Sequence, residues 1–261
     1  QDWFGCACCP PNIARLIASI GGYIYSQAEK DAYVHLYVQG SGTLEVGGKQ
    51  VVLRQETDYP WDGTIRISVN PDEPTVVGLN LRIPGWSRNA CLRREGRGRQ
   101  ATLTVNGETV DLEAITSLGY ARIEREWKSG DEVQLVLPMP VERIEAHPAV
   151  RQNIGYVALQ RGPVVYCLEQ VDNRIPLHRI VLPRDSELKV HFEKKLLGGI
   201  AVIKGEALVV DDSDWDNMLY RPEPSKLKPK GHERLFEITA IPYYAWDHRE
   251  PGEMRVWLRA M

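Results

Sequence analysis

The chain has 261 residues, of which 43% are hydrophobic and 26% are charged. This composition is typical of a folded, soluble protein with one large domain or two ordinary ones, and it excludes a disordered chain. The formal net charge is −3, because 35 acidic residues slightly outnumber 32 basic residues. Since there is no basic excess, we expect no nucleic-acid partner and no membrane partner. No apolar run in the sequence approaches the roughly 18 to 20 residues that a membrane helix needs.

Three of the five cysteines lie at the start of the chain, as Cys6, Cys8 and Cys9. An odd and clustered set is a poor disulfide framework for a chain of this length. It favours a reducing, cytoplasmic location, and it is typical of metal ligation, redox chemistry or a nucleophile. The chain also begins at Gln1 in the middle of this motif, so we expect that an upstream segment is missing.

The residues after the cysteines predict one helix over residues 11–20. Four apolar residues recur at helical spacing and form one stripe: Ile13, Leu16, Ile17 and Ile20. Pro10 and Pro11 suit the start of a helix, and Gly21 suits its end. A lone helix of about three turns cannot form a core, so it must pack on something else.

From about residue 31 the hydrophobic period changes to two, as in residues 64–69. The pairs Gly47-Gly48 and Asn106-Gly107 predict tight hairpins, because type I′ turns need positive φ at both central residues. Many short strands with turn residues between them predict a mainly β fold with two antiparallel, jelly-roll-like β-sandwich domains, preceded by the one helix.

Breaks in the pattern suggest where these domains begin and end. Residues 1–25 are expected to hold the terminal segment and the helix. Because Leu137-Pro138-Met139-Pro140 interrupts the strands, we expect a first sandwich over residues 26–140 and a second over residues 141–261. For the final strand, at about 253–261, a return to the first sandwich stays open.

Cys8 and Cys9 stand just before the predicted helix, where the helix dipole and free N–H groups favour a thiolate. A thiolate serves both metal binding and nucleophilic attack. Tetrahedral zinc needs four ligands. Cys8 and Cys9 supply two of them and Cys6 is a candidate third, whereas Cys91 and Cys167 stand alone in the sequence. The cluster is therefore either a nucleophilic site or a set of buried or metal-holding thiols.

The run Cys-Ala-Cys-Cys-Pro-Pro-Asn-Ile-Ala-Arg at residues 6–15 resembles glycoside hydrolase family 127, the β-L-arabinofuranosidases. Further matching motifs follow in chain order at residues 21–25, 59–63, 81–86, 159–166 and 241–246. The resemblance covers the whole chain, but only the C-terminal part of a family member.

This resemblance implies an N-terminal (α/α)6 barrel with the active site, followed by β-sandwich domains. The helix of residues 1–25 would then belong to the missing barrel. It also implies that a zinc-bound cysteine attacks the anomeric carbon and that water hydrolyses the thioglycosyl intermediate with retention. By the motif, Cys8 is the nucleophile, and Cys8 and Cys9 are zinc ligands. Since the other ligands and the acid/base Glu lie in the barrel, the chain alone is expected to be inactive.

The partners expected are an arabinofuranoside oligosaccharide or glycoconjugate, the upstream barrel in the same or a separate chain, and a second copy in a homodimer. The alternative is a non-catalytic module for carbohydrate binding or dimerisation, for which Tyr243, Tyr244 and Trp246 are candidate surface residues. A third reading, a thiol redox or metal-storage protein, is disfavoured because cysteines so close in sequence form strained bridges. His35 and His248 are expected to be structural or surface residues.

Overall fold

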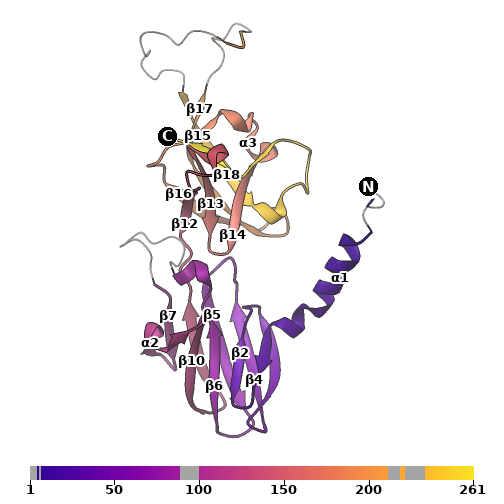
Figure 1. Ribbon diagram of the computed structural model, residues 1–261, viewed down its shortest axis with the longest axis vertical. Helices are drawn as coiled ribbons and strands as arrows, with labels where there is room; N and C mark the ends of the chain where they lie inside the picture. Colours follow the sequence, from indigo (N-terminus) through magenta and orange to yellow (C-terminus); the bar gives the residue numbers. More distant parts are fainter. Residues whose placement is uncertain (1–4, 6, 89–99, 211–217, 221–232) are drawn as a thin grey trace. The chain divides into compact units, whose positions relative to one another are not determined.

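The computed structural model describes residues 5, 7–88, 100–210, 218–220 and 233–261, and Figure 1 traces its elements. The chain divides into two compact units, residues 1–139 and 140–261. Strands dominate both units, which confirms the mainly β fold. Within the described residues, no helix is long and apolar enough to cross a membrane.

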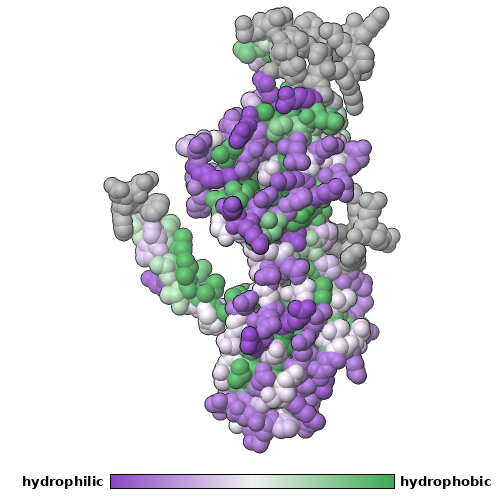
Figure 2. Space-filling model, turned by 180° about the vertical axis from the view of Figure 1, so that it is seen from behind, coloured by the Kyte–Doolittle hydropathy of each residue, from purple (hydrophilic) through white to green (hydrophobic). Residues whose placement is uncertain are grey.

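The predicted helix is present as α1 (Cys9–Ser19), and a short 3₁₀ helix, η1 (Ile20–Tyr23), continues it. It begins two residues earlier than the sequence suggested, because Cys9 already has helical geometry. None of the residues of α1 is buried by the described part of the chain. Along its apolar stripe Ile13 is 58% exposed and Ile17 is 65% exposed, and Figure 2 shows this stripe as a green band along the helix. The stripe therefore has no packing partner within the described residues.

The first unit is a sandwich of two sheets. One sheet contains β1 (Tyr25–Gln27), β2 (Asp31–Val34), β6 (Thr75–Arg82), β10 (Tyr120–Trp127) and β9 (Thr116–Ser117), in that order. The other contains β3 (Gly40–Val46), β4 (Lys49–Thr57), β5 (Thr64–Pro71), β11 (Asp131–Val136), β7 (Thr102–Val105) and β8 (Glu108–Val110). The pairings are antiparallel except that of β2 with β6, which is parallel. A one-turn helix, α2 (Leu112–Ile115), has Asp111 as its N-cap residue. The 3₁₀ helix η2 spans Gly85–Arg88.

Alternating residues from both sheets form the core of this unit. On β5 the side chains of Ile65, Ile67 and Val69 are buried, as the alternation predicted. They share one cluster with Leu79 of the other sheet. Burying one face of each sheet fixes the register of the strands, because a slip of one residue would turn the apolar side chains to solvent.

The two predicted hairpin turns are confirmed. Gly47 and Gly48 have φ angles of 63° and 74°, and Asn106 and Gly107 have φ angles of 50° and 82°. Positive φ at both central residues is the requirement of a type I′ turn, which matches the right-handed twist of the two strands it joins. The turns connect β3 with β4 and β7 with β8.

The described residues of the second unit form nine strands and a few short helices. The strands are β12 (Val141–Glu145), β13 (Tyr156–Arg161), β14 (Val164–Glu169), β15 (Ile180–Leu182), β16 (Leu188–Glu193), β17 (Ile200–Val210), β18 (Glu233–Pro242), β19 (Met254–Arg255) and β20 (Leu258–Ala260). The helices are η3 (Arg151–Asn153), α3 (Gln170–Asn173), η4 (Leu177–Arg179) and η6 (Tyr243–Ala245).

The pairing joins these strands into one continuous sheet. The pairing runs from β13 through β20, β15, β17 and β18 to β14, and β14 pairs again with β13. The path closes because β13 is long enough to pair with β12, β14 and β20. One pairing, β15 with β20, is parallel. The second core, which includes Leu159 and Ile203, is formed by residues of this closed path.

The C-terminal strands decide between the two sandwiches. Both strands within residues 253–261 pair within the second unit, not with the first sandwich. Strand β19 pairs with β14, and β20 pairs with β13 and β15. The continuous strand suggested by the alternation is divided in two, since each half has different neighbours.

Candidate functional site

The two adjacent cysteines lie where the sequence placed them, at the N-terminus of α1. Cys8 is the N-cap residue and Cys9 is the first helical residue. Both side chains are exposed, and their Sγ atoms lie 3.8 Å apart. The structure therefore presents two neighbouring thiols to solvent and does not seal them in a core.

The first turn of α1 has fewer backbone donors than the sequence argument assumed. Pro10 and Pro11 are its second and third residues, and proline has no N–H group. Cys8 also makes no side-chain cap. The favourable dipole remains, but two of the backbone N–H groups that usually stabilise an anion at a helix start are absent.

A polar side chain of the first turn binds the backbone of Cys8. The side-chain amide Nδ2 of Asn12 donates a hydrogen bond of 2.8 Å to the carbonyl oxygen of Cys8, and the backbone N–H of Asn12 donates to the same oxygen at 3.3 Å. Arg15 in turn donates from Nη1 to Oδ1 of Asn12 at 3.0 Å. Sequence reasoning treated Asn12 only as an early-turn residue and did not single out Arg15.

The spacing of the two sulfurs suits a shared zinc ion. Two thiolates that bind one tetrahedral zinc at about 2.3 Å lie about 3.8 Å from each other, which is the separation of the Cys8 and Cys9 sulfurs. The described residues contain no group of three or more His, Cys, Asp or Glu side chains that could hold a metal ion. Cys8 and Cys9 thus fit as two zinc ligands, and Cys6, the candidate third, lies outside the described residues together with Cys91.

Cys167 has a different environment from that of Cys8 and Cys9. It lies on β14, is only 2% exposed and belongs to the second unit. Burial first, and then the nearby carboxylates of Glu169 and Asp172, raise the pKa of its thiol to about 12. Such a thiol stays protonated and inert at neutral pH.

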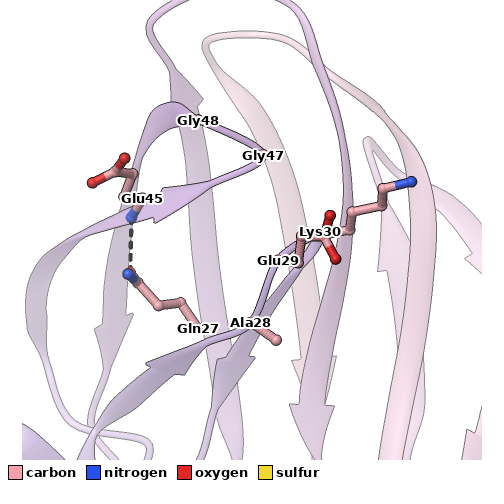
Figure 3. Close-up of a pocket in the computed structure, with 7 residues that line it drawn as sticks. All are labelled: Gln27, Ala28, Glu29, Lys30, Glu45, Gly47 and Gly48. Atoms are coloured by element: carbon pink, nitrogen blue, oxygen red, sulfur yellow. Dashed lines mark hydrogen bonds between the residues drawn. The ribbon is translucent and has the colours of Figure 1, made fainter.

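An open concavity of the first unit, with a volume of about 640 Å³, carries no comparable chemistry. It lies between two turns and is lined by Gln27, Ala28, Glu29, Lys30, Glu45, Gly47 and Gly48. Figure 3 shows that the carboxylate of Glu45 points away from the side chains of Glu29 and Lys30. The described lining contains no aromatic ring on which a sugar could stack.

Each ring nitrogen of His35 lies within hydrogen-bond distance of a hydroxyl group. Its Nε2 lies 2.7 Å from Oγ of Ser26, and its Nδ1 lies 2.8 Å from the hydroxyl of Tyr120. Burial and the neighbouring Arg82 cation lower the pKa of its imidazole. The three residues come from β1, the end of β2 and β10, so the ring joins separate strands. His248, the other histidine considered, is exposed.

Family models match most of the chain. The model "Beta-L-arabinofuranosidase, GH127 middle domain" matches residues 31–139, and the model "Glycoside hydrolase family 127 C-terminal domain" matches residues 141–259. The chain belongs to glycoside hydrolase family 127. A curated relative, the non-reducing end β-L-arabinofuranosidase of Bifidobacterium longum subsp. longum, is 37% identical over 270 residues. That match covers 99% of this chain and 38% of the relative.

Solved family 127 structures have the same fold over the whole chain. A family 127 β-L-arabinofuranosidase from Geobacillus stearothermophilus T6 is 51% identical, with a TM-score of 0.89, over 100% of this chain and 38% of that protein. A second family 127 β-arabinofuranosidase is 37% identical, with a TM-score of 0.86, over 100% of this chain and 40% of that one. Residues 1–30, with the cysteine pair and α1, lie outside both family models but within these structural matches.

Proposed function

We propose that Cys8 is the nucleophile of a retaining glycosidase that releases β-L-arabinofuranose. The observation that carries this proposal is the exposed Cys8–Cys9 pair, with its sulfurs 3.8 Å apart at the start of α1. Family 127 membership and relatives named β-L-arabinofuranosidases support the choice of sugar. An exposed thiol pair also needs a reducing compartment, such as the cytoplasm.

The reaction needs two displacements at the anomeric carbon. In the first, the Sγ of Cys8 forms a C–S bond while the glycosidic C–O bond breaks, and an acid protonates the leaving oxygen. In the second, a base takes a proton from water, the water oxygen bonds to the anomeric carbon and the C–S bond breaks. Two inversions give net retention of configuration. Cys8 is suited to both steps because it is exposed, so a sugar can reach its sulfur.

We also propose that Cys8 and Cys9 hold zinc. When bound, the ion would supply positive charge that keeps the sulfurs in the thiolate form. Cys9 then acts as a neighbouring ligand, while Cys8 faces the substrate. Asn12 donates a hydrogen bond to the backbone carbonyl of Cys8, and Arg15 donates one to Asn12.

The remaining groups are proposed to come from a further domain. The chain spans 38% of the length of the curated relative it matches. Ile13, Leu16 and Ile17 are each more than half exposed on α1. We propose that this apolar stripe packs against the helices of the catalytic barrel, which brings Cys8 to the acid/base carboxylate.

An activity assay tests the proposal. The chain is measured alone and joined to the barrel that precedes it in relatives, with an aryl β-L-arabinofuranoside as substrate. We expect turnover only in the joined protein, loss of turnover in its Cys8→Ser variant, and one pentosyl group on Cys8 by mass spectrometry of the quenched reaction. Turnover by the chain alone, or full activity of the Cys8→Ser variant, contradicts the proposal.

A second candidate function is carbohydrate binding by the second unit. Tyr243 and Tyr244 are 43% and 60% exposed, and the Tyr243 ring stacks with Trp246 at a centroid distance of 6.3 Å and an interplanar angle of 27°. Exposed, mutually supported rings suit stacking against a sugar. Titration calorimetry with arabinan oligosaccharides tests this role: binding that survives Tyr244→Ala argues against it.

A further inference from the structure

The peptide group that joins Cys8 to Cys9 is held by a two-residue bracket. Asn12, four residues after Cys8, binds the Cys8 carbonyl oxygen through both its side-chain and its backbone N–H groups. Arg15, three residues further along the same helix face, binds the Oδ1 atom of Asn12 and so fixes which way its amide points. The bracket therefore runs from Arg15 through Asn12 to the peptide plane between the cysteines.

This peptide group lies at the start of α1, in a turn that contains two prolines. Pro10 and Pro11 remove backbone donors from the first turn, and Cys8 makes no side-chain cap. Because Cys8 and Cys9 are exposed, core packing does not fix their side chains either. The orientation of the shared peptide plane sets the directions of both Cα–Cβ bonds. Together with the χ1 rotamers of the two side chains, it sets the separation of the two sulfurs.

We infer that Asn12 and Arg15 are positioning residues that hold the Cys8 and Cys9 sulfurs at the spacing needed to chelate one thiophilic ion. The inference rests on the proposed function for its role in catalysis. The spacing itself is a property of this chain, and it can be measured without glycosidase activity.

Phenylarsine oxide is a probe for this spacing, because its arsenic binds two sulfurs at once. Two As–S bonds form, the As–O double bond breaks, and the oxygen leaves as water with both thiol protons, without a change of oxidation state. Iodoacetamide, by contrast, alkylates one thiol at a time. Comparing the two reagents separates the geometry of the pair from the accessibility of each sulfur.

All variants carry Cys6→Ser, so that only Cys8 and Cys9 form an adjacent pair. Asn12→Ala is expected to weaken phenylarsine oxide binding about fivefold, the effect of losing one hydrogen bond, while alkylation of Cys8 stays within about twofold. Asn12→Asp keeps an acceptor for Arg15 but cannot donate to the Cys8 carbonyl, so it should match Asn12→Ala. Arg15→Lys should retain more binding than Arg15→Met, since it keeps one donor.

Ser19→Ala is the matched control, because it removes a hydrogen bond to the Arg15 carbonyl from the same helix, further from the cysteines. It should leave both phenylarsine oxide binding and alkylation by iodoacetamide unchanged. Unchanged arsenical binding in Asn12→Ala would overturn the inference, and so would an equal change with both reagents, which indicates general loss of the helix. If the bracket variants behave as expected but the joined protein shows no glycosidase activity, the proposed function fails and the positioning role stands.

Discussion

The indole Nε1 of Trp127 donates a hydrogen bond of 2.9 Å to the carbonyl oxygen of Val77. Trp127 ends β10 and is fully buried, and Val77 lies on the adjacent strand β6. A buried indole N–H needs such a partner, because leaving it unpaired is costly. The contact therefore ties two strands together through a side chain as well as through the backbone ladder.

Trp127→Phe is expected to destabilise the first unit by about 2 to 3 kcal/mol, because it removes this hydrogen bond and leaves a cavity. Urea unfolding with hydrogen exchange of the β6 amides measures the change. Val76→Ala is the control, since its side chain is 60% exposed on the same strand, and it should cost less than about 0.5 kcal/mol. Equal effects of the two substitutions would show that Trp127 does not support the core.

Arg249→Met is expected to destabilise the second unit by about 3 kcal/mol, since it leaves two carboxylates without their cation. Arg249 binds Glu169 and Asp172, whose side chains are only 8% and 13% exposed. Thermal unfolding measures the loss. Arg184→Met serves as the control, because its pair with Glu145 is 3.6 Å long and its side chain is 75% exposed, so it should cost at most about 1 kcal/mol.

The His35 imidazole should make the first unit less stable in mild acid. Burial and Arg82 lower its pKa in the folded state, so the unfolded chain takes up a proton first as the pH falls. The contribution of His35 to the free energy of unfolding is fully present above about pH 6.5, the ordinary pKa of histidine. It declines as the pH falls from there toward the lower pKa of the folded state.

His35→Gln should flatten this decline in the first unit, whereas His248→Gln should not, because His248 belongs to the second unit. Urea unfolding on both sides of about pH 6.5, with NMR titration of the His35 ring, measures the effect. A His35 ring that titrates above the ordinary value would reverse the expected sign.

Alkylation should distinguish the cysteines. Cys8 and Cys9 are exposed, whereas Cys167 is buried and its pKa is raised to about 12. At neutral pH, iodoacetamide is expected to modify Cys167 more than about 100-fold more slowly than Cys8. Peptide mapping by mass spectrometry measures both rates, and labelling in denaturant serves as the control. Comparable rates in the folded chain would mean that β14 opens readily.

Local chemistry explains what the sequence could predict. The turns at Gly47-Gly48 and Asn106-Gly107 depend on residues that accept positive φ, so their sequence alone identifies them. The Cys8–Cys9 pair is close because the residues are adjacent and the following prolines begin a helix. Polar residues four and seven positions after Cys8 were the available signal for Asn12 and Arg15. Their importance depends on hydrogen bonds that spacing alone does not establish.

Long-range pairing explains what the sequence could not predict. The closed sheet of the second unit requires β13 to pair with three strands and β20 to run parallel to β15. Alternation shows which residues face inward, but it does not name the partner of a strand. In the sequence of residues 253–259, Met254, Val256 and Leu258 occupy alternate positions even though the strand partners change within this segment. The segment therefore resembles one continuous strand.

The place of β20 in the closed sheet has a consequence for biosynthesis. Leu258–Ala260 lie between β13 and β15 in the pairing order, although they are made last among the strands. Until β20 has been synthesised, these two neighbours lack one of their partners, and the ring cannot close. The second unit must therefore wait for almost its entire length to emerge, whereas the strand pairings of the first unit need no residue after Val136.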